Sequence, residues 1–457
     1  MIQTILIGLV SLGAIIFIHE LGHFIAAKGF GIEVEAFALG WGRKLLSFTR
    51  GATEYRINIF PMGGYCRMKG EEEFREALAA KSDSFAGSPG SLFSVSPLKR
   101  LITYAAGPIF NFLLAGLLLS FIWWIGYTYV TYEPRIILTS QYSEVYEVTE
   151  DLSPAERAGL ESGDVIRTLD GKTITTFSDL QQIIISNPQK EMDITYERDG
   201  VLFSRTIRPG LNRSSGAGYV GIAPYVQPVV SRIQPDSSAE LAGLRQGDVI
   251  KSVDGVSVAH QMDFYAYLIS RTPGSAELTV QRDGRELTLS YVPSYNDQGH
   301  YVSGFAFQAL EIQTPAYSFL GSLGPGFAEA VETFFLTIRS IGVLFRGVDT
   351  AEAVAGPIRI TYLVGDATTQ GFQAGVREGF ITLFRLIAFI SIALSFANLL
   401  PIPALDGGQI VLSVYEIIRG RMISPRKYYI LQLIGFSIIM SIFFFALLSD
   451  ITFFTRR

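Results

Sequence analysis

The sequence is poor in cysteine, histidine and charge. It has one cysteine, Cys66, and four histidines in 457 residues, and only 17% of its residues are charged. A single cysteine excludes an intramolecular disulfide framework, so the burial of apolar side chains must stabilise the fold. The net charge of -5 is small and no block of lysine and arginine occurs, which argues against a nucleic-acid partner.

Long apolar runs are abundant instead. Hydrophobic residues make up 49% of the chain and the mean hydropathy is +0.32, which favours a membrane protein with a sizeable water-soluble insert. Four runs approach the roughly 20 residues that cross a bilayer, namely 5–27, 101–125, 380–400 and 430–448. No lysine or arginine precedes the first run, so we interpret it as a retained span and not as a signal peptide.

Lysine and arginine set the expected orientation of the spans. They gather in the link between the first two runs and in the link between the last two, which predicts that both links are cytoplasmic. The long insert between the second and third runs then lies outside, in the periplasm. The predicted segments are of three kinds. The spans with their ends are 1–27, 101–126, 380–408 and 430–457, and the cytoplasmic links are 28–100 and 409–429. The insert is divided into 127–212, 213–296 and 297–379.

Two of the four histidines stand in the pentapeptide His19-Glu20-Leu21-Gly22-His23, inside the first apolar run. On a helix, His19 and His23 face the same way, so both can bind one metal ion while Glu20 lies beside it as a general base. Ionisable residues inside a span cost about 2.5–3.5 kcal/mol on insertion scales and are functional by default. A helix whose polar residues only face a neighbouring helix is the alternative.

Catalytic zinc usually has three protein ligands and one open position. The third ligand is best supplied by Asp406 in the segment 398–408, N-L-L-P-I-P-A-L-D-G-G, where the third run ends. The first and third spans run in the same direction, so all three ligands reach one depth. The paired prolines predict broken helix beside a cavity, or only a helix terminator. Zinc is favoured by ligand type, although iron or cobalt would suit the same atoms.

The insert contains a repeat of two copies. Residues 153–166 match 237–250, and the match returns at 198–200 and 282–284 with the same offset. The shared signature A-x-x-A-G-L-x-x-G-D-x-I resembles bacterial PDZ domains, and two unspecified β-rich repeats are the alternative. Elsewhere, alternation over 54–59 predicts a strand in a membrane-associated β-loop. Helical spacing over 319–345 predicts an amphipathic helix, either interfacial or packed in a core.

These motifs together resemble the site-2 protease family of intramembrane metalloproteases. The resemblance covers nearly the whole chain, because residues 40–42, 54–55 and 61–65 are similar to the family's β-loop and residues 105–111 to its second-span signature. It implies a multi-pass α-helical membrane protein with four transmembrane helices, a membrane-associated β-loop and two periplasmic PDZ domains of α+β type, at 127–212 and 213–296.

The resemblance also implies roles for individual residues. Zinc would be held by His19, His23 and Asp406, with Glu20 as general base. Asn398 and Pro401 would engage the substrate. An edge strand near Tyr55, Ile57 and Ile59 could pair with an unwound substrate. The segment Tyr219-Val220-Gly221-Ile222 resembles the peptide-binding loop of a PDZ domain. The first repeat has no equally clear counterpart.

The implied function is peptide-bond hydrolysis inside the bacterial inner membrane. The substrate would be a single-pass membrane protein of the anti-sigma-factor type, already trimmed by another protease, with the PDZ pair as a size filter. A membrane-anchored PDZ scaffold with a non-catalytic metal site is the alternative, although Cys66, His260 and His300 are poorly placed to close a structural site. A tethered protease of soluble proteins is disfavoured by the apolar flanks 14–18 and 24–27.

Overall fold

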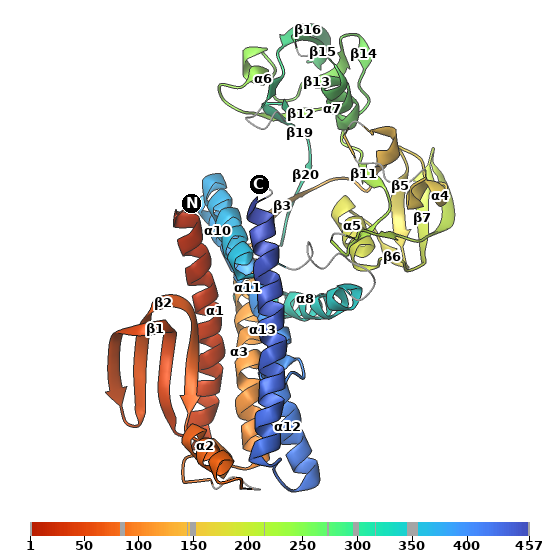
Figure 1. Ribbon diagram of the computed structural model, residues 1–457. Helices are drawn as coiled ribbons and strands as arrows, with labels where there is room; N and C mark the ends of the chain where they lie inside the picture. Colours follow the sequence, from red (N-terminus) through yellow and green to blue (C-terminus); the bar gives the residue numbers. More distant parts are fainter. Residues whose placement is uncertain are drawn as a thin grey trace. The chain divides into compact units, whose positions relative to one another are not determined.

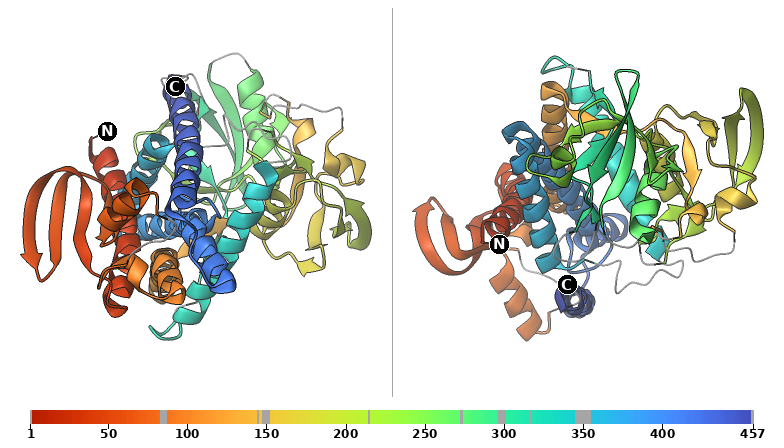
Figure 2. Two further views of the ribbon diagram at one scale, coloured as in Figure 1. Left: turned by 60° about the horizontal axis from the view of Figure 1, so that its bottom comes forward. Right: turned by 90° about the horizontal axis from the view of Figure 1, so that it is seen from above.

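The computed structural model describes residues 2–455 except 83–86, 144, 147–151, 214, 272–273, 296–300, 316 and 345–354. Contacts divide the chain into two units, which we call the helical unit (Met1–Tyr127 with Thr314–Arg457) and the β-rich unit (Thr128–Gln313). Figures 1 and 2 show the long helices of the first and the small sheets of the second.

Four helices of the helical unit are long and apolar enough to cross a membrane, which confirms the four predicted spans. They are α1 (Ile2–Gly29), α3 (Pro97–Ile125), α11 (Val376–Leu399) and α13 (Pro425–Thr455). The charge in the third predicted span, Arg385, lies with its guanidinium 4.3 Å from the centre of the Tyr127 ring. A cation over an aromatic face is partly compensated for its desolvation, which helps this arginine to stay in an apolar helix.

Shorter elements complete the helical unit: α2 (Glu71–Ala79), the 3-10 turn η1 (Leu92–Ser94), α8 (Leu323–Leu344), α10 (Pro357–Ala374) and α12 (Asp406–Arg419). Helix α8 confirms the predicted amphipathic helix. Its Ala330 is buried in a cluster with α3 and α11, whereas Val331, Phe335 and Ile338 are exposed, so core packing accounts for one part of its apolar face. Helix α12 occupies much of the segment expected as a cytoplasmic loop at 409–429.

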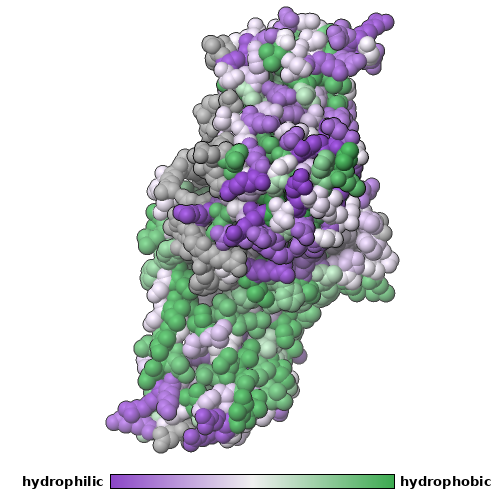
Figure 3. Space-filling view, turned by 90° about the vertical axis from the view of Figure 1, so that its right-hand side faces the viewer, coloured by the Kyte–Doolittle hydropathy of each residue, from purple (hydrophilic) through white to green (hydrophobic). Residues whose placement is uncertain are grey.

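Small residues let the helices approach closely. A Cβ on Gly22 of α1 would lie 2.4 Å from the Ala106 carbonyl oxygen of α3. A Cβ on Gly365 of α10 would lie 1.8 Å from the Thr4 oxygen of α1, and Gly435 of α13 packs in the same way on Ala404. Such contacts are typical of helices that associate in lipid. On the face drawn in Figure 3, hydrophobic side chains cover most of the helical unit.

The β-loop is a long bent hairpin of β1 (Val34–Arg50) and β2 (Thr53–Met68) beside α1 (Figure 1). Because both strands bend, the hairpin has four rows in the order 44–50, 53–58, 36–39 and 64–68. Tyr55 pairs with Phe37 on one side and with Phe48 on the other. The expectation that the row near Tyr55 forms an edge is therefore wrong, since this row is internal.

The β-rich unit consists of two similar modules. The first module runs from β4 to β11 and the second from β12 to β19, and each has a four-stranded sheet, in the orders β6-β5-β7-β8 and β14-β13-β15-β16. The strands of the first are β4 (Ile136–Leu138), β5 (Val165–Leu169), β6 (Lys172–Thr173), β7 (Met192–Arg198), β8 (Val201–Ile207), β9 (Gly210–Leu211), β10 (Gly218–Tyr219) and β11 (Ile222–Pro224), with η2 (Thr139–Gln141), α4 (Pro154–Arg157) and α5 (Phe177–Ser186).

The second module repeats this plan with the equal offset seen in the sequence. Its elements are β12 (Val230–Ile233), α6 (Ser238–Leu241), β13 (Val249–Val253), β14 (Val256–Ser257), α7 (Gln261–Ser270), β15 (Ala276–Arg282), β16 (Arg285–Tyr291), β17 (Ser294–Tyr295), β18 (Tyr301–Val302) and β19 (Phe305–Phe307). The strands that enter and leave the unit, β3 (Thr128–Thr131) and β20 (Leu310–Gln313), pair antiparallel.

The boundary between the modules differs from the expected 212/213. Strand β11 pairs with β4, and Val220 is buried in the core of the first module. The segment Tyr219–Ile222 therefore belongs to the first module and not to the second. Its counterpart in the second module is the segment ending at Gly304, which approaches Ser237 as Gly221 approaches Ser153. The sequence repeat locates two copies but does not show where each core closes.

Candidate metal centre

Helix α1 places two buried imidazoles together. The Nε2 atoms of His19 and His23 are 3.2 Å apart, as the i, i+4 spacing predicts. The carboxylate of Asp406 joins them from α12, with Oδ2 3.1 Å from His19 Nε2 and Oδ1 3.4 Å from His23 Nε2. The structure thus brings the three sequence-predicted ligands into one cluster.

The dimensions of this cluster fit zinc. Ligand atoms at about 2.0–2.1 Å from a tetrahedral zinc ion are roughly 3.3 Å from each other, which matches the three separations. In the part of the chain that the structure describes, the cluster of histidine and acidic ligands has three members. Cys66, whose thiol pKa is raised to about 12 by burial, is not among them. Three ligands are typical of a catalytic site with an open position.

Asp406 reaches the histidines because the chain bends sharply after α11. The helix ends at Leu399, and the bend continues through Pro401 and Pro403 until α12 begins at Asp406 itself. The two glycines that follow allow this start, since a Cβ on Gly407 would lie 2.3 Å from the Leu399 oxygen and one on Gly408 would lie 2.2 Å from the Ile402 oxygen. The bend thus requires glycine at both positions, because a side chain there would collide with the backbone of the preceding segment.

Helix α3 closes the other side of the cluster. The Thr103 carbonyl oxygen lies 2.8 Å from His23 Nδ1 and accepts a hydrogen bond from it. One turn later Gly107 faces both rings, and a Cβ there would lie 2.4 Å from His23 Nε2 and 2.8 Å from His19 Cε1. A further turn on, the Asn111 amide lies 3.3 Å from His19 Nδ1. These three residues lie one helical turn apart. Gly107 and Asn111 fall in the segment 105–111, which resembles the family's second-span signature, but the sequence-based prediction gives none of the three a role at the metal. Their i, i+4 spacing is the signal that could have indicated it.

Comparison with known proteins agrees with this geometry. The model of a family described as peptidase family M50 matches residues 7–442. The chain belongs to peptidase family M50. It is 38% identical over 449 residues to a protein of Treponema pallidum named "Putative zinc metalloprotease", covering 98% of this chain and 99% of that protein. It is 27% identical over 462 residues to the "Regulator of sigma E protease" of Haemophilus influenzae, covering 97% of each.

Membership of this family confirms the resemblance to the site-2 proteases and the prediction that the chain is a peptidase. Glu20, the glutamate of the H-E-x-x-H motif, is half-buried beside the cluster. Its carboxylate accepts a hydrogen bond from the backbone of Cys66, in the 64–68 row of β2. That row pairs on one side with 36–39 and is an edge of the hairpin.

The predicted substrate residues lie at different distances from the cluster. The Asn398 amide nitrogen is 3.5 Å from His19 Nε2, and Pro401 is exposed in the bend that leads to Asp406. By contrast, Ile57 and Ile59 lie on the hairpin with 46% and 49% of their surface exposed. The structure thus brings Asn398 to the cluster, whereas Tyr55 and Ile57 lie in the internal row of the hairpin.

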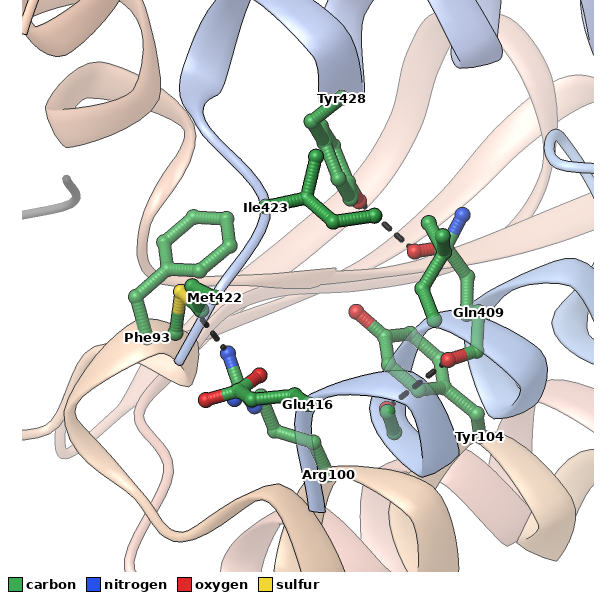
Figure 4. A pocket seen from close by; sticks show the side chains of 10 residues that line it. Phe93, Arg100, Tyr104, Gln409, Glu416, Met422, Ile423 and Tyr428 are labelled. Atoms are coloured by element: carbon green, nitrogen blue, oxygen red, sulfur yellow. Dashed lines mark hydrogen bonds and ion pairs between the residues drawn. The ribbon is translucent and has the colours of Figure 1, made fainter. Parts of the chain in front are cut away.

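A cavity of about 30 Å³ lies next to the bend, between α3, α12 and α13 (Figure 4). It exceeds the roughly 10–15 Å³ that one water needs. The buried Arg100 forms an ion pair with Glu416 on its wall. On the opposite side Gln409 donates to the Pro403 carbonyl at 2.5 Å and accepts from the Tyr428 hydroxyl at 2.8 Å. Gln409 therefore ties the proline bend to α13.

Proposed function

We propose that this protein is an intramembrane zinc metalloprotease that hydrolyses a peptide bond within the spanning segment of a single-pass membrane protein. The observation that carries the proposal is the cluster of His19, His23 and Asp406, whose ligand atoms lie within 4.8 Å of one another on helices apolar enough to span a bilayer. These three residues would hold the zinc ion. When bound, it would lower the pKa of a water molecule towards about 7 and polarise the scissile carbonyl.

Glu20 is the general base. Its carboxylate takes a proton from the attacking water as the new C–O bond forms, and it delivers that proton to the leaving amine nitrogen as the C–N bond breaks. The hydrogen bond from the Cys66 backbone and the packing of Glu20 against Gly64 hold the carboxylate on the side of the hairpin. One residue thus serves both proton transfers without leaving its position.

The substrate has to be extended before it can be cut, because a helix hides its carbonyls in its own hydrogen bonds. Extended backbone in lipid needs partners. The 64–68 row of the hairpin is an edge next to Glu20, so it supplies backbone donors and acceptors for an added strand. Asn398, beside His19, and Pro401, in the bend, contact the same substrate segment.

The orientation follows from charge. Lysine and arginine in the two links support an orientation with the metal centre towards the cytoplasmic side of the bacterial inner membrane and the β-rich unit in the periplasm. The two modules are PDZ domains that act as a size filter and admit substrates whose outer domain has been removed. An anti-sigma factor cut first by another protease has this form, and one relative of the chain is named a regulator of sigma E protease.

The test is cleavage of a single-pass substrate, with its outer domain removed, in membranes that contain the wild type or a variant. We expect the wild type to cut within the span. Glu20→Gln, His23→Ala and Asp406→Asn should abolish the cut, and Glu72→Gln, which changes an exposed glutamate on α2, should not. Cleavage that survives in Glu20→Gln, or fails in the wild type, would favour a scaffold with a non-catalytic metal site.

A second substrate tests the filter. The same span with a folded outer domain should resist the wild type and become a substrate once that domain is cleaved off. Equal cleavage of both forms would remove the filter from the proposal and leave the protease.

A further inference from the structure

The two ligand histidines receive different partners from α3. For His23, the partner of Nδ1 is the backbone carbonyl of Thr103, at 2.8 Å. A carbonyl can only accept, so Nδ1 of His23 carries a proton. For His19, the partner of Nδ1 is the side-chain amide of Asn111, at 3.3 Å. An amide can donate or accept, so the tautomer of His19 is not fixed in the same way.

In the structure the amide nitrogen of Asn111 faces His19. In this orientation the amide donates to Nδ1, so the proton of a neutral His19 lies on Nε2, the atom that faces Asp406 Oδ2 at 3.1 Å. The Asn111 side chain is fully buried, and within the described residues its Oδ1 has no hydrogen-bond partner. With the proton on Nε2, this atom cannot bind a metal ion.

Rotating the amide by half a turn exchanges its oxygen and nitrogen while the other atoms stay in place. The oxygen then faces His19 Nδ1 and accepts its proton, and the Nε2 lone pair becomes free for a metal ion. The rotation needs no movement of the helices. The backbone of Asn111 is held separately, because its carbonyl accepts a hydrogen bond from the Ser391 hydroxyl of α11 at 2.9 Å.

We propose that Asn111 is the positioning residue of His19 and that its amide follows the tautomer of this histidine. It accepts from Nδ1 when zinc is bound and donates to Nδ1 when zinc is absent. The inference rests on the proposed function, because it assumes that His19 Nε2 binds zinc. An amide serves both states without adding charge, whereas a carbonyl or carboxylate would serve only the loaded state.

Zinc affinity of the full-length protein in detergent tests the role of the side chain. Zn²⁺ competition with a chelator should show a dissociation constant raised about 10–100-fold in Asn111→Leu, the range typical of lost outer-shell partners. Asn111→Asp keeps an acceptor for Nδ1 and should stay close to the wild type. The control is Ser120→Ala, which removes another buried polar group of α3, a hydroxyl that donates to the Gly116 carbonyl of the same helix.

Imidazole ¹⁵N spectra of the protein with Asn111 in place test the tautomer directly, so the inference does not depend on the folding of an Asn111 variant. With four histidines in the chain, His260→Gln simplifies assignment. We expect the His19 proton on Nε2 without metal and on Nδ1 with zinc. The same tautomer in both states would overturn the amide exchange, and equal zinc affinity of Asn111→Leu and wild type would overturn the positioning role.

The outcomes separate the two proposals. If the wild type binds zinc and cleaves while Asn111→Leu binds zinc equally well, only the role of Asn111 fails. If the wild type binds no zinc and does not cleave, the proposed function fails and this inference fails with it.

Discussion

Gly107 makes the sharpest test of the metal centre. An added Cβ would lie 2.4 Å from His23 Nε2, whereas ordinary contacts begin at 3.4 Å, so Gly107→Ala must displace the ring by about 1 Å. Metal sites tolerate deviations of about 0.2 Å in ligand distance. Alanine is the better helix former by about 0.8–1.0 kcal/mol, so the loss cannot come from the backbone.

We therefore expect Gly107→Ala to bind zinc more weakly than the wild type and to lose at least about 100-fold in kcat/KM, the typical effect of a 1 Å misplacement. Zinc competition and cleavage of the trimmed substrate measure both effects. The matched control is Gly116→Ala on the same helix, which pushes against the Phe327 ring at 2.5 Å and does not touch the histidines. It should keep wild-type zinc affinity.

If Gly107→Ala bound zinc and cleaved like the wild type, the placement of the imidazoles against α3 would be wrong. If both glycine variants lost zinc alike, the effect would be general damage to helix packing, and the specific reasoning would fail as well.

Three further predictions concern other parts of the chain. Arg198→Met removes both hydrogen bonds from Arg198 to the buried carboxylate of Asp164 and should destabilise the first module by about 3–5 kcal/mol, measured by hydrogen exchange in the full chain. Burial lowers the pKa of His260, which bonds to Tyr142 of the first module. As the pH falls, this histidine therefore takes up its proton in the unfolded chain at a higher pH than in the folded chain. Stability of the β-rich unit should then fall as the pH drops below about 6.5, seen as a lower melting temperature. Gln409→Leu frees the proline bend and should reduce cleavage about 10–100-fold.

Each of these has its own control. Arg167→Met breaks only an exposed pair with Glu197 and should change stability by at most about 1 kcal/mol. The fall in stability between pH 7 and pH 5 should be smaller in His260→Gln, and an equal fall would show that another group is responsible. Tyr428→Phe removes one of the two hydrogen bonds of Gln409 and should reduce cleavage less than Gln409→Leu does.

The repeat also explains why the Arg198 prediction extends to the second module. Arg282 donates to both oxygens of Asp248 and to the Gly243 carbonyl, at the same offset along the chain. The aspartate of the G-D pair that both copies share is thus a buried carboxylate, and it needs a guanidinium partner 34 residues later. Arg282→Met should therefore destabilise the second module by a similar amount.

The sequence by itself determined the features that depend on local periodicity. The spacing of four between His19 and His23 sets both imidazoles on one face of any helix, and apolar runs of sufficient length define the four spans. The equal offset of the repeat fixes two similar modules. Asp406 was also predictable, because two spans with the same direction bring their ends to one depth.

Only the tertiary structure decided what depends on neighbours. Alternation over 54–59 indicates a strand but not which strands flank it, so the internal position of Tyr55 could not be predicted. A repeat shows its copies and not where a core closes, so the segment 219–222 was assigned to the wrong module. The partners that α3 offers to the two histidines lie about 80–90 residues away along the chain, and only the packing at Gly22 and Gly107 brings them within hydrogen-bond distance.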